Sequence, residues 1–328
     1  MVNELIKRID EDVADILNTG FEYSATRTVP SSEKSGLTFE RGEVKKGQTI
    51  STCVLFVDIR DSVTMSQQYG VKIMGKIYTA FTKAVIKAAH HHGGSVRNII
   101  GDRVMIVFPI ENCFKNAIDC AVSINHVSRN IMTKHFNNVN FKCGIGIDYG
   151  ELKVIKVGLG KQGVERTENK GLVWVGNPAN IASRLTDKAN KTITEDYYLV
   201  KWHAYNYFYI TGMNSLSMYP NSTKPQNNSL YSNNETIKEM TPADFASRVC
   251  TDNNGKLYLT GGKLISFEKK TREIEFQPIL ITNEVYQGFR RDCPNRYSIK
   301  NNLWTEVKQH IKNVQSKVYS GDFFWKIN

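Results

Sequence analysis

The 328-residue chain has no long apolar run and no closely spaced cysteine pair. Residues 1–20 lack the apolar core of a signal peptide, and no stretch approaches the length of a membrane span. The six cysteines show neither CxxC spacing nor ligand spacing with histidine, which is typical of reduced thiols in a protein core. These absences predict a cytoplasmic protein without a membrane span.

Basic residues are in excess but are not concentrated anywhere. The chain has 43 Lys and Arg against 32 Asp and Glu, a formal net charge of +11. Such a charge suits nucleic acid, an anionic membrane or a small polyphosphate. No basic arm with interleaved aromatic residues occurs, so we expect no nucleic-acid partner and favour a basic cleft around a phosphate substrate. The stretch "GLGKQG", at 158–163, fits GxGxxG by letter, but no helix pattern follows it, and it predicts only a loop.

The periodicity predicts an α+β fold. Residues 3–18 form an amphipathic helix that must pack on the body or on a second copy of the chain, and 21–49 form an extended linker. The elements that follow are a strand at 52–58, a helix at 62–90, strands at 95–100 and 103–108, a helix at 112–135 and a strand at 140–148. This order is the ferredoxin-like βαββαβ arrangement, an antiparallel sheet with helices on one face.

Composition divides the chain into four segments. The predicted segments are 1–49 (helix and linker), 50–190 (core), 191–277 (insertion) and 278–328 (C-terminal end of the core). The insertion has strand-like flanks around an Asn-, Ser- and Pro-rich stretch, which predicts β ribbons with a flexible tip before the last strands of the core.

Two carboxylates stand where this topology brings strand ends together. Asp58 ends the apolar run "VLFV", and Asp102 lies in the turn between two apolar strands. In a βαββαβ sheet the first strand runs antiparallel to the second strand of the hairpin, so Asp58 meets the hairpin turn. Taken singly, Asp58 could be a solvated acid and Asp102 a turn residue. Together they predict a site for a hard cation such as Mg²⁺ or Mn²⁺.

Three motifs, in order and spacing, resemble the catalytic domain of class III nucleotidyl cyclases. They are "LFVDIRDSV", "IIGDRVMIVF" and "VGNPANIASRL", and "FKCGIGIDYGELKVIKVG" and "ILITNEVYQGF" are also similar to family elements. The resemblance covers about residues 50–190 and 278–328. It implies a metal site at Asp58 and Asp102, with the backbone carbonyl of Ile59 as a further ligand. The amides that it implies for binding the β- and γ-phosphates are those of Arg60, Asp61 and Ser62.

The same resemblance implies a second half of the active site. Asn180 and Arg184 lie four residues apart, on one helix face. In the family this Asn orients the ribose and this Arg neutralises charge on the α-phosphate. Lys317 matches a late phosphate-binding lysine or is simply a surface lysine. Because the two halves face each other across a subunit interface in the family, a homodimer with two equivalent sites is expected.

The base-recognition positions depart from the family pattern. The first falls on Asn98 and the second near Val173 or Trp174, and neither the adenylate nor the guanylate cyclase pair is present. Asn98 can donate and accept, which suits a pyrimidine, and Trp174 could fill the room of a purine or be a core residue. With the N-terminal helix and the insertion, this resembles the pyrimidine cyclases of bacterial antiphage (Pycsar) signalling. UTP is favoured over CTP, and ATP remains an alternative.

The resemblance implies a two-metal reaction using Mg²⁺ or Mn²⁺. The ribose 3′-hydroxyl of the nucleoside triphosphate attacks the α-phosphate and pyrophosphate leaves, giving a cyclic nucleotide such as cUMP. A separate effector protein is expected to read this product. The competing hypothesis is a catalytically silent cyclase-like domain that binds nucleotide; loss of an Asp, the Asn or the Arg would mark it, and all four are present.

Overall fold

A computed structural model describes residues 2–32, 36–158, 170–206, 230–251, 253 and 255–327. All but the first residue of the "GLGKQG" loop, and residues 207–229 of the predicted insertion, with the first part of its Asn-, Ser- and Pro-rich stretch, lie outside the described residues. The chain forms two compact units, Met1–Lys191 with Phe276–Asn328, and Thr192–Glu275.

The first unit is built on one mixed sheet. Its described strands run in the order β13-β14-β12-β5-β2-β4-β3, with β1 beside β2 and β6 beside β5. The strands are β1 Phe21–Ala25, β2 Lys45–Ile59, β3 Ser95–Ile100, β4 Arg103–Val107, β5 Cys143–Gly158, β6 Lys170–Val175, β12 Ile279–Thr282, β13 Thr305–Val307 and β14 Val318–Gly321. The central neighbours of β2, which are β4 and β5, both run antiparallel to it. The predicted α+β, ferredoxin-like fold is confirmed.

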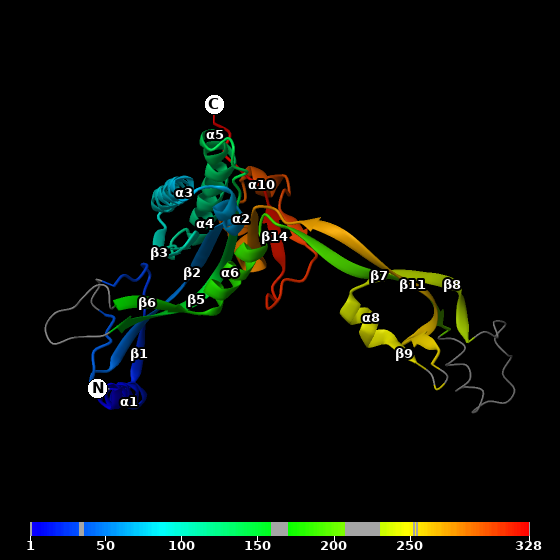
Figure 1. The fold of residues 1–328 in the computed structure, drawn as a ribbon, viewed down its shortest axis with the longest axis horizontal. Helices are drawn as coiled ribbons and strands as arrows, with labels where there is room; N and C mark the ends of the chain where they lie inside the picture. The colour runs from blue at the N-terminus through cyan, green and yellow to red at the C-terminus, as the bar shows by residue number, and fades with distance from the viewer. Residues whose placement is uncertain are drawn as a thin grey trace. The chain divides into compact units, whose positions relative to one another are not determined.

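Helices of this unit, α1 excepted, lie on both faces of the sheet, whereas the sequence predicted one face (Figure 1). The helices are α1 Val2–Asn18, α2 Ser62–Gln68, α3 Val71–His91, α4 Cys113–His126, a π-helical segment Val127–Met132, α5 Thr133–His135, α6 Asn177–Lys188, α9 Asn283–Asp292 and α10 Tyr297–Lys300. Side chains of α3, α4 and α9 pack with Leu55 and Val57, while Ala182 of α6 packs with Val54 from the opposite face.

Gly146 in β5 explains why α6 packs so closely on the sheet. A Cβ on Gly146 would collide with the carbonyl oxygen of Ala182 and the amide nitrogen of Thr186, so only glycine lets the helix backbone come this close to the strand. The Thr186 hydroxyl then donates to the carbonyl of Phe56 at 3.1 Å, tying α6 to β2 as well. This close contact fixes where the face of α6 that bears Asn180 and Arg184 lies.

Two local expectations were wrong. The helix predicted at 62–90 breaks into α2 and α3 around Tyr69, whose backbone is extended, and Gly70, which precedes α3. The predicted linker contains β1, which pairs in parallel with the start of β2 from Phe21↔Lys45 to Ala25↔Thr49.

The N-terminal helix is attached through its acidic side. Asp15 accepts from the Gly42 amide at 2.8 Å and from the buried Lys45 ammonium at 3.2 Å. No residue of α1 is buried, and its apolar residues stay exposed. They are Val2, Leu5, Ile6, Ile9, Val13, Ile16 and Leu17. The sequence predicted that this apolar stripe packs either on the body or on a second copy of the chain. Within the described residues of this chain, the stripe does not pack on the body.

The second unit is a five-stranded antiparallel sheet with one short helix. Its described elements are β7 Thr192–Tyr205, β8 Tyr231–Met240, α8 Pro242–Arg248, β9 Val249–Thr251, β10 Leu257–Leu259 and β11 Gly262–Glu275, with sheet order β8-β7-β11-β10-β9. Val200, Met240, Phe245 and Leu259 form its core. Across the described part of both units, no helix is long and apolar enough to cross a membrane.

Candidate active site

Asp58 and the β3–β4 turn lie together, as the sequence predicted. The antiparallel register of β2 and β4 pairs Val57 with Val104, so the next residues along, Asp58 and Arg103, face each other. Asp58 shares the sheet face of Val54 because both are even-numbered residues of one strand. Its side chain is 15% exposed. The carboxylate is therefore a half-enclosed group at the strand end, under the side of α6.

Arg103 is the main partner of this carboxylate. Its Nη2 donates to Asp58 Oδ2 at 2.9 Å, and its Nη1 donates to the Ser183 hydroxyl at 2.9 Å. Nη2 also contacts the carboxylate of Asp187. The pKa of Arg103 is raised because the hydrogen bonds to Asp58 and Asp187 outweigh its desolvation. Sequence reasoning did not single out this residue, although it directly follows Asp102 in "GDRV".

Arg60 lies on the other side of Asp58 and corrects one expectation. Its guanidinium is buried, donates to the carbonyl of Thr186, and places Nη1 at 3.7 Å from Asp58 Oδ2. Its backbone amide donates to the Lys142 carbonyl at 2.8 Å, so it is not free to bind phosphate as predicted. Of the three predicted amides, Asp61 and Ser62 remain, at the turn into α2, where Asp61 has a φ of 56°.

Asp102 carries an unsatisfied carboxylate oxygen. Its Oδ2 is buried and has no hydrogen-bond partner among the residues that the structure describes. Burial, and then the nearby charge of Asp58, raise the pKa of Asp102, while a hydrogen bond with Ser62 lowers it. The described ranges contain no cluster of three or more His, Cys, Asp or Glu that could hold a metal. The candidate site thus consists of two carboxylates and the backbone near Ile59, which ends β2.

The predicted Asn–Arg pair lies on α6, the same helix whose Ser183 and Asp187 contact Arg103. Asn180 is exposed and Arg184 is half-buried. The side-chain oxygen of Asn313, turned toward the guanidinium, accepts from Arg184 Nη1 at 3.2 Å and Nη2 at 3.3 Å. In the described part of the chain, no hydrogen bond or ion pair joins Asp58 or Asp102 to this pair. Asn313 was not expected, because its contact with Arg184 joins residues far apart in sequence.

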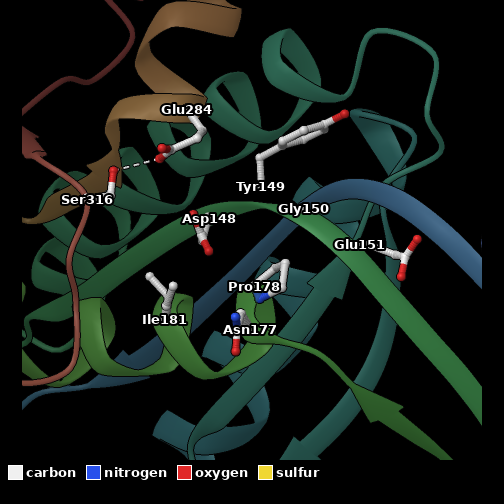
Figure 2. Close-up of a pocket in the computed structure, with 9 residues that line it drawn as sticks. All are labelled: Asp148, Tyr149, Gly150, Glu151, Asn177, Pro178, Ile181, Glu284 and Ser316. Carbon is white, nitrogen blue, oxygen red and sulfur yellow. Dashed lines mark hydrogen bonds between the residues drawn. The ribbon is translucent and has the colours of Figure 1, made fainter.

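A cavity of about 480 Å³ lies beside α6 (Figure 2). Asp148, Glu284 and Ser316 are among its lining residues, and the Ser316 hydroxyl donates to Glu284 at 2.7 Å. Asp148 is buried and accepts from the Thr282 hydroxyl at 2.6 Å, and its burial raises its pKa to about 6. Lys317, which follows Ser316, is exposed and pairs with Glu306 at 3.1 Å.

The positions predicted to recognise the base have different surroundings. Asn98 is exposed on the edge strand β3, opposite Met105 of β4. Val173 is 41% exposed on β6. Trp174 packs against the core cluster beneath α6, and its buried indole N–H has no partner among the described residues. Trp174 therefore has the packing of a core residue, while Asn98 is open to a ligand.

The chain is similar in sequence to known cyclases. The model of the adenylate and guanylate cyclase catalytic domain matches residues 44–200. A uridylate cyclase of Xanthomonas perforans is 32% identical over 178 residues, covering 52% of this chain and 72% of that protein. One from Burkholderia cepacia is 29% identical over 193 residues, covering 57% and 80%. The solved adenylyl cyclase CyaB from P. aeruginosa covers 84% of this chain and 95% of its own, at 12% identity and a TM-score of 0.45.

The chain therefore belongs to the family of adenylate and guanylate cyclase catalytic domains, the class III nucleotidyl cyclases. It is an enzyme of that class. Within the family it resembles the proteins described as uridylate cyclases, four of which match it at 25% to 32% identity.

Proposed function

We propose that the protein converts UTP into 3′,5′-cyclic UMP and pyrophosphate. The observation that carries the reaction type is the nearness of Asp58 to Asp102, whose buried Oδ2 has no partner in the described chain. The base is inferred from the relatives described as uridylate cyclases and from exposed Asn98, which can both donate to and accept from a pyrimidine edge. CTP and ATP are the alternatives that the experiment must separate.

The residues present fit a divalent cation. Carboxylate and carbonyl oxygens are the ligands that Mg²⁺ and Mn²⁺ prefer, and an unpartnered buried carboxylate oxygen is costly unless a ligand satisfies it. Asp58, Asp102 and the carbonyl of Ile59 would hold the metal. When bound, a pair of such ions supplies activation of the ribose 3′-hydroxyl and shields the triphosphate charge.

Other groups would bind the nucleotide. The amides of Asp61 and Ser62 bind the β- and γ-phosphates, and Lys317 adds a positive charge by exchanging its contact with Glu306 for phosphate. Arg184 stabilises the negative charge that develops on the α-phosphate, and Asn180, four residues earlier on α6, orients the ribose. In the family these two halves of the site face each other across a subunit interface, so the complete site of this proposal forms between two copies in a homodimer.

The cyclic nucleotide would serve as a second messenger in antiphage defence, read by a separate effector protein. This role rests on the resemblance of the N-terminal helix, linker and insertion to the pyrimidine cyclases of that system. The enzymatic proposal does not depend on it.

The test is incubation of the purified protein with UTP, CTP, ATP and GTP in parallel, with Mn²⁺ or Mg²⁺, and identification of products by mass. Asp58→Asn serves as the inactive comparison. Cyclic UMP formed by the wild type and lost in the variant is the expected result. Cyclic AMP as the main product would overturn the proposed base, and no product from any nucleotide would favour the silent nucleotide-binding domain.

A further inference from the structure

Two guanidinium groups flank the carboxylate proposed to bind metal. Both approach the same oxygen, Asp58 Oδ2, from Arg103 Nη2 at 2.9 Å and from Arg60 Nη1 at 3.7 Å. A divalent cation bound to Asp58 and a guanidinium at hydrogen-bond distance from the same carboxylate repel each other. Both arginines therefore oppose metal binding at Asp58, and the one that is freer to move relieves this repulsion most readily.

The two arginines differ in their freedom to move. Arg60 is 3% exposed, and its guanidinium donates to the carbonyl of Thr186 in a space that exists because residue 144 is glycine. Arg103 is 28% exposed and has two partners on α6 that do not belong to the metal site, Ser183 and Asp187. Arg103 can leave Asp58 without losing all of its hydrogen bonds, whereas Arg60 has a buried charge that would be left without its nearby carboxylate.

We propose that Arg103 is a built-in counter-cation that competes with the divalent metal for Asp58, and that Ser183 and Asp187 retain it when metal binds. The inference rests on the proposed function, because it takes Asp58 as a metal ligand. Arg103 thereby sets the metal concentration at which the site fills. Arg60 stays in place and orients Asp58 in both states.

The partners of Arg103 explain why this side chain can give up its contact with Asp58 to a metal ion. Asp187 is 53% exposed, so its attraction for Arg103 is screened by solvent and holds the side chain without locking it. Asp58 is the more enclosed of the two acids, at 15% exposed, and loses more by being left unpaired. Arg103 accordingly rests on Asp58 in the metal-free protein and moves toward α6 when a stronger cation takes its place.

The test measures Mn²⁺ binding to the full-length protein without nucleotide, by the loss of the electron paramagnetic resonance signal of free Mn²⁺. Arg103→Met should bind Mn²⁺ about tenfold more tightly than the wild type, because it removes a charge-assisted hydrogen bond that metal must otherwise break. Lys142→Met is the matched control. Lys142 is exposed and lies next to Cys143, which pairs with Ile59. The Lys142→Met substitution therefore removes one positive charge near the same end of the sheet.

The control should keep the affinity of the wild type to within about twofold, as expected for a solvent-screened charge. Equal tightening by both variants would mean a general charge effect and would overturn the inference, as would unchanged binding by Arg103→Met. Asp58→Asn separates this inference from the proposed metal site. If Asp58→Asn binds Mn²⁺ like the wild type, the metal assignment fails and the inference fails with it. If it loses binding while Arg103→Met is unchanged, the inference alone fails.

A second measurement follows the Arg103 side chain directly in the wild-type protein. In protein labelled with ¹⁵N-arginine, the Nε–H resonance of Arg103, assigned with Arg103→Lys, should shift on saturation with diamagnetic Mg²⁺. The buried Arg60 resonance should move much less. An Arg103 resonance unaffected by saturating Mg²⁺ would show that its contact with Asp58 persists, and would overturn the inference.

Discussion

Arg184 on α6 is held by Asn313, a residue 129 positions later that lies between the buried anchors Ile311 and Val314. Asn313 has a φ of 61°, the left-handed conformation that asparagine and glycine tolerate best. The loop before β14 thus presents an amide oxygen to the arginine proposed to stabilise the α-phosphate. A bound acceptor fixes the direction of the guanidinium before substrate arrives.

Removing this amide should slow the reaction with little loss of stability. Asn313→Gly keeps the left-handed backbone and deletes only the side chain. We expect kcat to fall about tenfold, the order expected for losing a hydrogen bond to a charged group, with a smaller change in KM. Steady-state kinetics and thermal unfolding check this. Exposed Lys312→Ala, one residue away, is the control. Full kcat in Asn313→Gly would mean that substrate alone orients Arg184.

The proposed active site combines Asp58 of one copy with Arg184 of the other, which predicts that inactive variants rescue each other. Asp58→Asn and Arg184→Ala should each lose activity as homodimers. Mixed in equal amounts and allowed to exchange subunits, half of the dimers are mixed and each has one intact site, so about a quarter of wild-type activity should return. The same variants combined in one chain and mixed with themselves should recover none. Absence of rescue after demonstrated exchange would place the whole site within one chain.

Gly146 should not tolerate even one methyl group. In Gly146→Ala the Cβ meets the backbone of α6 at Ala182 and Thr186, so the helix must move and shift Arg184 with it. We expect a loss of about 1–3 kcal/mol in the free energy of unfolding, and reduced kcat. Gly75→Ala is the control, because nothing lies within 4 Å of its Cβ position in the second turn of α3. It should stabilise the protein by about 0.5–1 kcal/mol.

Sequence reasoning located the elements whose signals are local. The apolar run before Asp58 and the turn at Asp102 predicted a strand end meeting a hairpin turn, because antiparallel pairing of neighbouring strands leaves little other choice. The structure brings these two carboxylates together. Their role as ligands, and that of Asn180 and Arg184, stays a prediction.

The contacts that escaped sequence reasoning are long-range. Which face α6 covers depends on Gly146 admitting a helix backbone, and the sequence pattern of α6 does not contain that information. The use of the Arg60 amide by Lys142 depends on how far the β2–β5 ladder extends. Arg103 reaches Ser183 across 80 residues. Such contacts are decided by tertiary packing, which local periodicity does not encode.

Asp148 should make stability depend on pH. Burial raises its pKa to about 6, from 3.8, so the folded protein favours the neutral acid. The stability that the neutral Asp148 contributes is fully present below the pKa that Asp148 has in the unfolded chain. It is lost as the pH rises through the pKa of Asp148 in the folded protein. Asp148→Asn keeps an oxygen for the Thr282 hydroxyl but cannot ionise. The free energy of unfolding of Asp148→Asn, relative to that of the wild type, should rise by up to about 3 kcal/mol between pH 4 and pH 8.

Urea unfolding of both proteins at pH 4, 6 and 8 measures this difference, and taking the difference cancels the titration of all other groups. Glu284→Gln is the control, because Glu284 faces the same cavity and its charge only adds to the effect of burial on the pKa of Asp148. It should leave most of the pH dependence in place. An Asp148→Asn difference that stays constant from pH 4 to pH 8 would mean that Asp148 is charged in the folded protein throughout this range, and that the cavity beside α6 hydrates it.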